Sequence, residues 1–332
     1  MAESLLLEII LEGSNALGNR DYHSFFEELL SVYWLRPETA LWRSIDIQTT
    51  STFNFNAPSL EIGCGDGIFS FIRGGGRFDI SFDAFQSIKN PDLDYYFKGK
   101  DIFDSFTKHS NPIVIRKPEY FIDCGLDYKK NLLKKARSLG LYKKLVLGDA
   151  NKVLPFEDNY FKSIFSNIIY WLNSPADVFR EINRILYPGG RCLVVLPNSN
   201  FPEYSFYYQH YLKKNNSRFN FLEKLDRGRI KDNLKHAKSG REWEKIIKSS
   251  GLKILSHEAY LSKTVIQIWD IGLRPIFPLL YRMVQNIKRE ELLKIKKEWI
   301  KTFKMFLEPI FLADKILNNN EEPAFHCFIL TK

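Results

Sequence analysis

The stretch Ala57–Phe71, APSLEIGCGDGIFSF, places three glycines at alternate positions directly after a short apolar run. Residues 57–62 are predicted to form a buried strand, and a helix of one to two turns is expected from Asp66. Glycine permits positive φ and lets a ligand approach main-chain N–H groups without meeting a Cβ atom. A strand, a glycine turn and a helix N-terminus form a ligand site at the carboxyl end of a parallel sheet. The stretch therefore predicts an α/β fold with a ligand bound at the turn.

The spacing of the glycines narrows the choice of ligand. The dinucleotide fingerprint requires a glycine at position 68, where this chain has Ile68, and no GK[ST] sequence follows to form a phosphate-binding P-loop. Glu61, two residues before the first glycine, would repel a pyrophosphate but would suit a cation or an amino group. The turn therefore favours a ligand that carries positive charge.

Further strands and helices alternate along the chain, apart from several long interruptions. Ser174 and Pro175 are expected to begin one helix, and the Pro-Gly-Gly sequence at 188–190 is expected to end it. Strands separated by helices imply a parallel sheet with right-handed crossovers, here doubly wound, mostly parallel and seven-stranded. The other predicted strands are 120–127, 142–148, one ending near Asn167, 191–198, 253–262 and 324–332, and the other predicted helices are 128–140 and 240–251.

The interruptions define the expected domain organisation. Residues 1–56 are predicted to be a helical lid segment, and 57–332 one domain with insertions at about 73–120, 198–239 and 263–320. Within the lid, Trp34, Trp42 and Arg43 are candidates to face a substrate, although packing against the sheet is the favoured interpretation.

Four motifs, in order along the chain, resemble those of the class I S-adenosylmethionine-dependent methyltransferases of the small-molecule type. They are EIGCGDG, GLDYKKNLLKKA, GDANKVLPFEDNYFKSIFSN and REINRILYPGGRCLVVLP. The resemblance covers roughly 57–70, 120–197 and 324–332. It implies a Rossmann-like methyltransferase fold and S-adenosylmethionine as the cofactor.

The resemblance also implies a set of cofactor-binding residues. The glycines would line the methionine part and the ribose, with Glu61 near the amino group. Asp127 would accept both ribose hydroxyls, since one carboxylate can satisfy the two donors of a vicinal diol. Asp149 and the backbone of Ala150 would bind the adenine edge. The full set is Glu61, Gly63, Cys64, Gly65, Gly67, Asp127, Asp149, Ala150 and Asn167, of which Asn167 would close the site.

Several of these residues have structural alternatives. Glu61 could be a solubilising charge at a strand end, Asp127 a helix N-cap, and Asp149 a turn residue. Asp79 and Asp83 compete with Asp127, because they follow the first glycine at the distance expected in a plain βαβ unit. Asp127 is preferred because it ends an apolar strand and opens a helix.

The implied reaction needs no fixed catalytic residue, because the protein mainly aligns the reacting atoms and excludes water. A hydroxyl acceptor would benefit from a general base, for which His210 and His236 are candidates. Tyr170 and Trp171 are candidates to line the acceptor pocket, with Tyr170 a further weak catalytic candidate. For each of these four side chains a packing or surface role is the alternative.

The net charge of +9 is unevenly distributed. Residues 205–304 carry about 23 Lys and Arg against about 10 Asp and Glu, a balance that could meet nucleic acid, anionic lipid or a phosphorylated substrate. Solvated helix faces are the plainer explanation. The favoured function is methyl transfer to a small-molecule, lipid-linked or sugar-linked acceptor. An RNA or protein methyltransferase and a non-catalytic cofactor-binding protein are the alternatives, and the oligomeric state is not indicated.

The cysteines and the most apolar segment of the chain bear on its cellular location. The four cysteines show no CxxC or Cys/His clustering, which predicts neither a metal site nor disulfides but reduced thiols in a cytoplasmic protein. No transmembrane segment is expected, because the best candidate, Val265–Met283, is interrupted by Asp270, Arg274 and two prolines. That stretch could instead lie on a membrane surface, with a helix packed on the core as the alternative.

Overall fold

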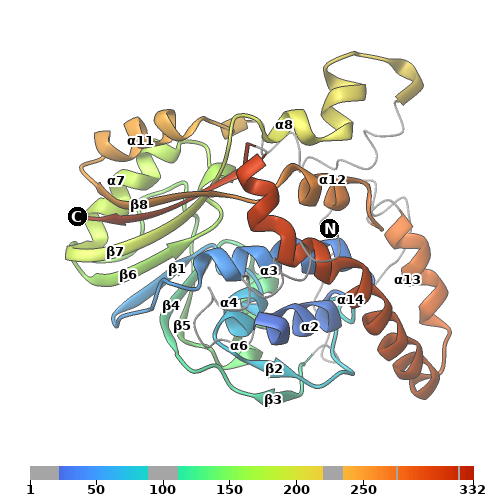
Figure 1. Ribbon diagram of the computed structural model, residues 1–332. Coiled ribbons are helices and arrows are strands. Elements are labelled where there is room, and N and C mark those ends of the chain that lie inside the picture. The colour runs from blue at the N-terminus through green and yellow to red at the C-terminus, as the bar shows by residue number, and fades with distance from the viewer. Residues whose placement is uncertain (1–21, 89–110, 220–234, 274–275, 321) are drawn as a thin grey trace.

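The computed structural model describes residues 22–88, 111–219, 235–273, 276–320 and 322–332 of the 332-residue chain (Figure 1). Seven strands form one sheet in the order β5-β4-β1-β6-β7-β9-β8. Their bounds are β1 Ser59–Ile62, β4 Ile122–Asp127, β5 Tyr142–Leu147, β6 Phe161–Ser166, β7 Leu186–Pro197, β8 Lys253–Tyr260 and β9 Phe325–Thr331.

The central strands of this sheet are parallel. β1 pairs with β4 and β6, β4 pairs with β5, and β6 pairs with β7, all in the same direction. β9 is antiparallel to both of its neighbours, β7 and β8. All four residues of β1 are buried, as expected for a strand covered on both faces. The sheet confirms the predicted doubly wound, mostly parallel, Rossmann-like fold.

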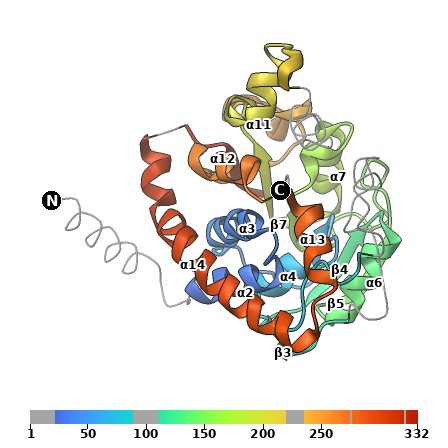
Figure 2. The same ribbon diagram turned by 90° about the vertical axis from the view of Figure 1, so that its right-hand side faces the viewer.

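Helices cover both faces of the sheet. Successive strand residues contribute to opposite faces, as Ile164 and Phe165 of β6 show by joining separate apolar clusters. Figure 2 shows α3 on one side of the sheet and α7 on the other. The helices of the first side are α3 Pro37–Thr50, α4 Ile68–Arg73 and α6 Lys130–Leu139, and those of the second are α7 Pro175–Ile185 and α11 Gly240–Ser249.

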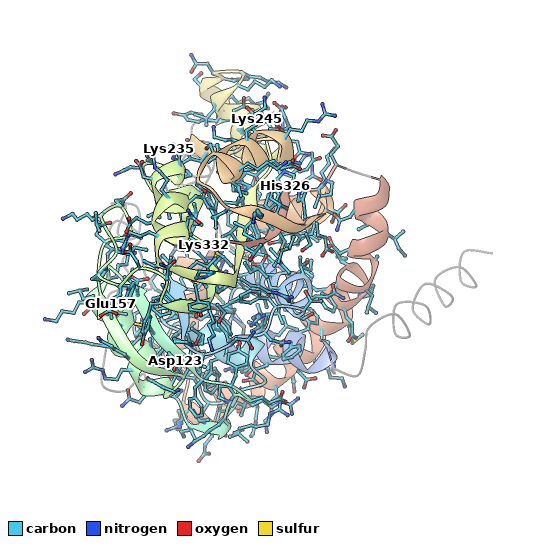
Figure 3. All side chains as sticks on the ribbon, turned by 90° about the vertical axis from the view of Figure 1, so that its left-hand side faces the viewer. Asp123, Glu157, Lys235, Lys245, His326 and Lys332 are labelled. Carbon is cyan, nitrogen blue, oxygen red and sulfur yellow. The ribbon has the colours of Figure 1, made fainter. Side chains whose placement is uncertain are left out.

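A histidine pair joins β8 to β9 on the face covered by α11. Figure 3 labels one member of the pair, His326, and Lys245 of α11. His257 Nε2 lies 3.0 Å from His326 Nδ1, and the His257 ring stacks on Phe328 with 4.1 Å between centroids. His326 is 4% exposed. Burial, and then the neighbouring His257, lower the pKa of His326 to about 4. Burial also lowers the pKa of His257, which Glu244 of α11 opposes. The folded chain therefore holds both rings neutral at pH 7.

Replacing His326 by Asn should remove part of the acid sensitivity of the fold. A histidine with a lowered folded pKa stabilises the chain above its unfolded value of 6.5, and this contribution is lost as the pH falls toward about 4. The loss corresponds to about 3 kcal/mol. Urea unfolding at pH 7.5 and 4.5 should show the native chain losing that much more stability than His326→Asn, whose amide does not titrate. Equal losses in the two proteins would contradict this assignment.

The predicted helix ends are largely confirmed. Gly140 follows α6 in the left-handed conformation, with φ 66°. The Ser174 side chain accepts a hydrogen bond from the main chain of α7, and Pro175 occupies the first helical position. At the start of α11, Ser239 and Glu242 form a capping box. These local signals operate within a few residues, so neighbouring sequence is sufficient to read them.

The predicted end of α7 at 188–190 is wrong. α7 ends at Ile185, and the chain enters β7 at Leu186, which pairs with Phe161 of β6. The register between β6 and β7 then shifts before Ser163, so the Pro-Gly-Gly sequence lies within an irregular start of the strand. Pairing with β6 overrides the local turn signal, because an exposed strand edge offers main-chain partners.

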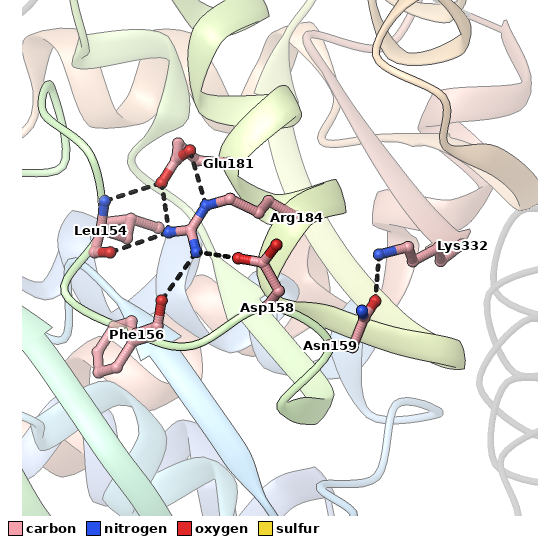
Figure 4. Close-up of polar contacts among 7 residues, drawn as sticks. All are labelled: Leu154, Phe156, Asp158, Asn159, Glu181, Arg184 and Lys332. Carbon is pink, nitrogen blue, oxygen red and sulfur yellow. Dashed lines mark hydrogen bonds and ion pairs between the residues drawn. The ribbon is translucent and has the colours of Figure 1, made fainter.

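The connection between β5 and β6, residues 148–160, forms no helix. The Arg184 guanidinium holds this connection, donating to the carbonyl oxygens of Leu154 (3.0 Å) and Phe156 (2.8 Å) (Figure 4). The same group donates to the carboxylate of Asp158 at 2.7 Å. A side chain of α7 thus fixes the connection between β5 and β6.

The described part of the N-terminal segment is mainly α2 (Tyr22–Val32) and α3. Trp34 is 2% exposed and meets the Trp299 ring edge-on, with 6.2 Å between centroids. Trp42 packs against Trp269 at 4.9 Å. The favoured prediction of core packing is confirmed for both tryptophans.

The three predicted insertions add structure outside the sheet. Part of the first, 89–110, and part of the second, 220–234, lie outside the described residues. Elsewhere the first forms a two-stranded antiparallel sheet, and the third is helical. Their elements are β2 Arg77–Phe78, β3 Val114–Arg116, α8 Phe201–Tyr204, the π-helical turn Tyr208–Leu212, the 3-10 turn Ser217–Phe219, α12 Lys263–Ile271, α13 Phe277–Gln285 and α14 Arg289–Asn320.

The structure bears on two predictions from the sequence, that the cysteines are reduced and that no segment spans a membrane. Cys64, Cys124, Cys192 and Cys327 are all buried and form no disulfide. Burial raises the pKa of Cys124 to about 11 and that of Cys327 to about 12, so both are thiols at neutral pH. Within the ranges that the structure describes, no helix combines the length and apolar character needed to cross a bilayer.

Candidate cofactor site at the glycine turn

All three glycines of the turn adopt positive φ, at 78° for Gly63, 56° for Gly65 and 77° for Gly67. A Cβ atom at Gly63 would lie 2.2 Å from Ile168 Cγ1, and one at Gly67 would lie 2.9 Å from Tyr142 Cε2. At Gly65 a Cβ atom would meet nothing within 4 Å. The chain's own side chains therefore exclude Cβ atoms at two positions, whereas Gly65 keeps open the approach that a ligand needs.

Asp127 connects the turn to the neighbouring strand. The Gly63 N–H donates to the carbonyl of Leu126 at 2.7 Å, and the Gly65 N–H donates to Asp127 Oδ2 at 2.9 Å. The other carboxylate oxygen of Asp127 accepts from the Lys129 N–H at 2.8 Å, directly before α6. Burial raises the pKa of Asp127, although these hydrogen bonds oppose the shift. Asp127 thus helps to start α6, and its remaining lone pairs stay available to a ligand.

Glu61 lies beneath the turn and is not a surface charge. Its side chain is 3% exposed, and the Tyr142 hydroxyl donates to Glu61 Oε2 at 2.8 Å. Burial raises the pKa of Glu61 to about 7. Because the Tyr142 ring also lies against position 67, the Glu61–Tyr142 pair supports the turn from below. The alternative of a solubilising strand-end charge is wrong.

The polar residues after β5 and β6 are tied to each other. Asp149 Oδ1 accepts from the main-chain and side-chain nitrogens of Asn151, both at 2.9 Å, and these bonds lower its pKa. Asn151 Oδ1 in turn accepts from the Asn173 N–H at 2.7 Å. Ala150 is buried, and Asn167 directly follows β6. Asp149 therefore has the turn role suggested as its alternative, and this role leaves its second oxygen available.

The strand order brings the predicted cofactor residues to one edge of the sheet. β5, β4, β1 and β6 are adjacent and parallel, so their carboxyl ends meet. Each carries part of the predicted set. Cys64 is 6% exposed within the turn, and burial raises the pKa of its thiol far above the usual range, so it is not a nucleophile.

The two competing aspartates have different surroundings. Asp79 accepts from the Ser81 N–H at 2.9 Å within its own turn. Asp83 lines a small crevice that it shares with Asp66 of the glycine turn. Burial raises the pKa of Asp83, while the charge of Lys296 from α14 opposes the shift. Neither aspartate ends a strand of the central sheet, which supports Asp127 as the strand-tip carboxylate.

The candidate bases are not gathered at the turn. His210 stacks on Phe206 in the second insertion, with 6.2 Å between centroids and 11° between ring planes. His236 hydrogen-bonds the backbone of Leu172, which follows β6. Burial, and then neighbouring lysines, lower the pKa of His236. His236 is therefore a neutral imidazole at pH 7, beside Leu172 at the end of the 3-10 turn Ile169–Trp171.

Tyr170 has mainly a packing role. Its side chain is 7% exposed, and its ring meets Trp171 at 5.1 Å and Phe325 at 6.0 Å. Trp171 is 49% exposed and directly follows it. Of the two aromatic residues predicted to line an acceptor pocket, only Trp171 presents much surface.

The sequence did not reveal a polar cluster that α3 brings to the same edge. Tyr260, at the end of β8, donates to Asp46 Oδ1 at 2.7 Å, and Arg43 lies 3.7 Å from Asp46 Oδ2. Burial raises the pKa of Asp46 to about 6, which Arg43 and Tyr260 oppose. The Arg43 guanidinium lies over the Phe69 ring at 5.5 Å, and its side chain is 35% exposed. The only sequence signal for this cluster was the spacing of Asp46 one helical turn after Trp42, which places both residues on the same face of α3.

Comparison with known proteins matches part of this chain to one family model. Residues 121–194 match the family model described as "Methyltransferase domain". This match over 121–194 and the seven-stranded, mostly parallel sheet both agree with the resemblance to the class I methyltransferases. The resemblance stated from the motifs is thereby confirmed.

A curated relative is the ubiquinone/menaquinone biosynthesis C-methyltransferase UbiE of Desulfotalea psychrophila, 33% identical over 94 residues. The match spans 26% of this chain and 38% of the relative.

The chain also matches solved structures at low sequence identity, including these two. An S-adenosylmethionine-dependent methyltransferase of Thermotoga maritima is 14% identical with a TM-score of 0.41, covering 70% of this chain and 84% of that one. One from Mesorhizobium loti is 14% identical with a TM-score of 0.38, covering 82% and 90%.

Proposed function

We propose that this protein transfers a methyl group from S-adenosylmethionine to a small-molecule acceptor, including one linked to a lipid or a sugar. The observation that carries the proposal is the main-chain opening at Gly65, which is hydrogen-bonded to the strand-tip carboxylate of Asp127. When bound, S-adenosylmethionine supplies an electrophilic methyl group on a positively charged sulfur, available to an acceptor by direct displacement.

The donor and acceptor groups at the turn suit this cofactor. Gly65 offers bare main chain, and Asp127 has lone pairs left after its two main-chain hydrogen bonds. A vicinal diol supplies two hydroxyl donors to a carboxylate held in this way. The half-buried Asn167 and the backbone of Ala150 lie at the tips of the flanking strands and would hold the adenine.

The charges around the turn also suit a cofactor that carries both signs. Acidic groups at Glu61, Asp66 and Asp127 favour a sulfonium or an amino group. Arg43 faces Asp46, Asp66 and two tyrosines, and their oxygens raise its pKa although burial opposes the shift. We assign Arg43 to the carboxylate of the methionine part, because its half-exposed guanidinium lies over the first turn of α4.

The proposed class of methyl acceptor rests on the residues that surround the carboxyl edge of the sheet. α3 covers it with Trp42 and Arg43, which helps to exclude water, so alignment supplies most of the acceleration. His236 is neutral and hydrogen-bonds the backbone of Leu172 in the segment after β6, which favours it over His210 as a base for a hydroxyl acceptor. The curated relative is named for C-methyl transfer in quinone biosynthesis, which favours a small organic acceptor over nucleic acid.

The test has two stages. Calorimetric titration of the purified chain with S-adenosylmethionine and with S-adenosylhomocysteine should give saturable heat for both. Incubation with methyl-labelled S-adenosylmethionine and fractionated cell extract should then place label in a small-molecule or lipid fraction. Binding without transfer to any fraction would indicate a non-catalytic protein, whereas label in RNA or protein would overturn the acceptor class.

A further inference from the structure

α13 exposes an apolar face to solvent. Ile276, directly before it, is 46% exposed, Leu279 is 49% exposed and Met283 is 61% exposed. Their spacing of three and four residues places them on one side of the helix. The opposite side is also apolar, with Phe277 buried and Leu280 half-buried. A helix that is apolar on nearly all sides is normally covered on all sides, so this face calls for a partner.

The charged residues that neighbour α13 in the sequence are all basic. The sequence from 271 to 289 contains four Lys and Arg and no Asp or Glu. Arg282 and Lys288 are both exposed, and Arg282 neighbours Met283 within the helix. Acidic residues resume at Glu290, in the first turn of α14. An apolar face flanked by cations complements an anionic lipid surface, where side chains enter the acyl boundary and cations meet headgroups.

α13 is connected to the glycine turn through one layer of chain. The Phe277 ring meets Phe85 at 4.8 Å, and the Tyr281 hydroxyl donates to the carbonyl of Ile88 at 3.1 Å. The segment 82–88 in turn shares a crevice with Asp66 of the turn. Figure 2 shows α13 at the front of this side of the molecule, with α14 running beside it. The exposed face is therefore on the flank of the candidate cofactor site.

The sequence analysis gave two possibilities for Val265–Met283, a helix on a membrane surface or a helix packed on the core, and each applies to a different part of the stretch. α12 buries Val265, Ile266 and Trp269, so its packing on the core agrees with the alternative. α13 packs only one side and exposes the other. Within this stretch, the exposed apolar side chains on one helix face are those of 276–283, and α12 adds only Ile271 at its last position.

We infer that α13 docks this protein peripherally on an anionic bilayer through Ile276, Leu279 and Met283, with Arg282 and Lys288 at the headgroups. The docking itself is independent of methyl transfer. It would bring the carboxyl edge of the sheet toward the bilayer, where a lipid-linked acceptor is available, and that consequence alone rests on the proposed function.

Vesicle co-sedimentation of the full chain without cofactor tests the docking. Vesicles of phosphatidylglycerol and phosphatidylcholine should retain the protein at low salt, and vesicles of phosphatidylcholine alone should retain much less. The double variant Leu279→Ser/Met283→Ser should weaken binding at least about fivefold, from the apolar area lost. Arg282→Gln should weaken it about threefold and reduce its salt dependence.

A matched control uses equally exposed apolar residues elsewhere. Ile115 on β3 is 66% exposed and Leu255 on β8 is 52% exposed, so Ile115→Ser/Leu255→Ser removes similar surface at unchanged charge. This variant should sediment like the native chain. Equal loss in both double variants, or no retention on anionic vesicles, would overturn the inference. A concentration-dependent dimer that the α13 variant alone abolishes would identify a second copy as the occupant instead.

Discussion

Gly65→Ala should strongly weaken the binding of S-adenosylmethionine while the chain stays folded. The added Cβ atom meets nothing in the protein within 4 Å, so it occupies only the space through which a ligand reaches the main chain. The positive φ of 56° makes the substitution cost about 1 kcal/mol in the folded state. We expect the dissociation constant measured by calorimetry to rise at least about 30-fold, and the melting temperature to fall by only a few degrees.

Gly63→Ala is the matched control within the same turn. Its Cβ atom would lie 2.2 Å from Ile168 Cγ1 and 2.9 Å from Cγ2, close to the stiff base of that side chain. The substitution should therefore reduce the free energy of unfolding by about 2–4 kcal/mol. If Gly65→Ala destabilised the chain as much as Gly63→Ala, or bound the cofactor normally, position 65 would not be the point of ligand approach.

Asp127→Ala should weaken cofactor binding about 100-fold. Two hydrogen bonds from a diol to a carboxylate are together worth about 3 kcal/mol or more. S-adenosylhomocysteine should be weakened by the same factor, because it carries the same ribose. A loss confined to S-adenosylmethionine would instead assign Asp127 to the sulfonium charge, and unchanged binding of both would exclude it from the site.

Asp127 also has a structural role that must be separated from binding. The Gly65 and Lys129 N–H groups both donate to its carboxylate, so Asp127→Ala should lower the stability of the ligand-free chain by about 1–2 kcal/mol. Asp127→Asn keeps an oxygen acceptor and should recover most of that stability while binding the cofactor weakly. Thermal unfolding followed by circular dichroism, without ligand, makes the comparison.

The sequence was most informative where a structure depends on near neighbours. The glycine turn, the ends of α6 and α11 and the buried strand β1 all follow from signals spanning a few residues. The same signals failed at 188–190, because pairing of Leu186 with Phe161 extends β7 through a sequence that would otherwise form a turn. Pairing with a neighbouring strand overrides the local turn propensity, because that strand supplies main-chain hydrogen bonds.

The positions of the candidate site residues could be predicted from the sequence, but their surroundings could not. The strand tips could be identified, because a carboxylate after an apolar strand marks the edge of a parallel sheet. The hydrogen-bond partners and the burial of each side chain could not be derived from the sequence. The Glu61–Tyr142 and Asp46–Tyr260 bonds join residues 81 and 214 positions apart, and the burial that shifts the pKa of Glu61 and Asp46 follows from those contacts.

The position of β9 has a consequence for how the molecule is made. β9 lies between β7 and β8, and β8 pairs only with β9 among the strands of the sheet. During synthesis on the ribosome, the strands up to β7 can assemble as they emerge, whereas β8 has no neighbour until residues 325–331 have left the exit tunnel. Proteolytic removal of that short segment from the newly made chain would therefore leave β8 detached and expose the edge of β7.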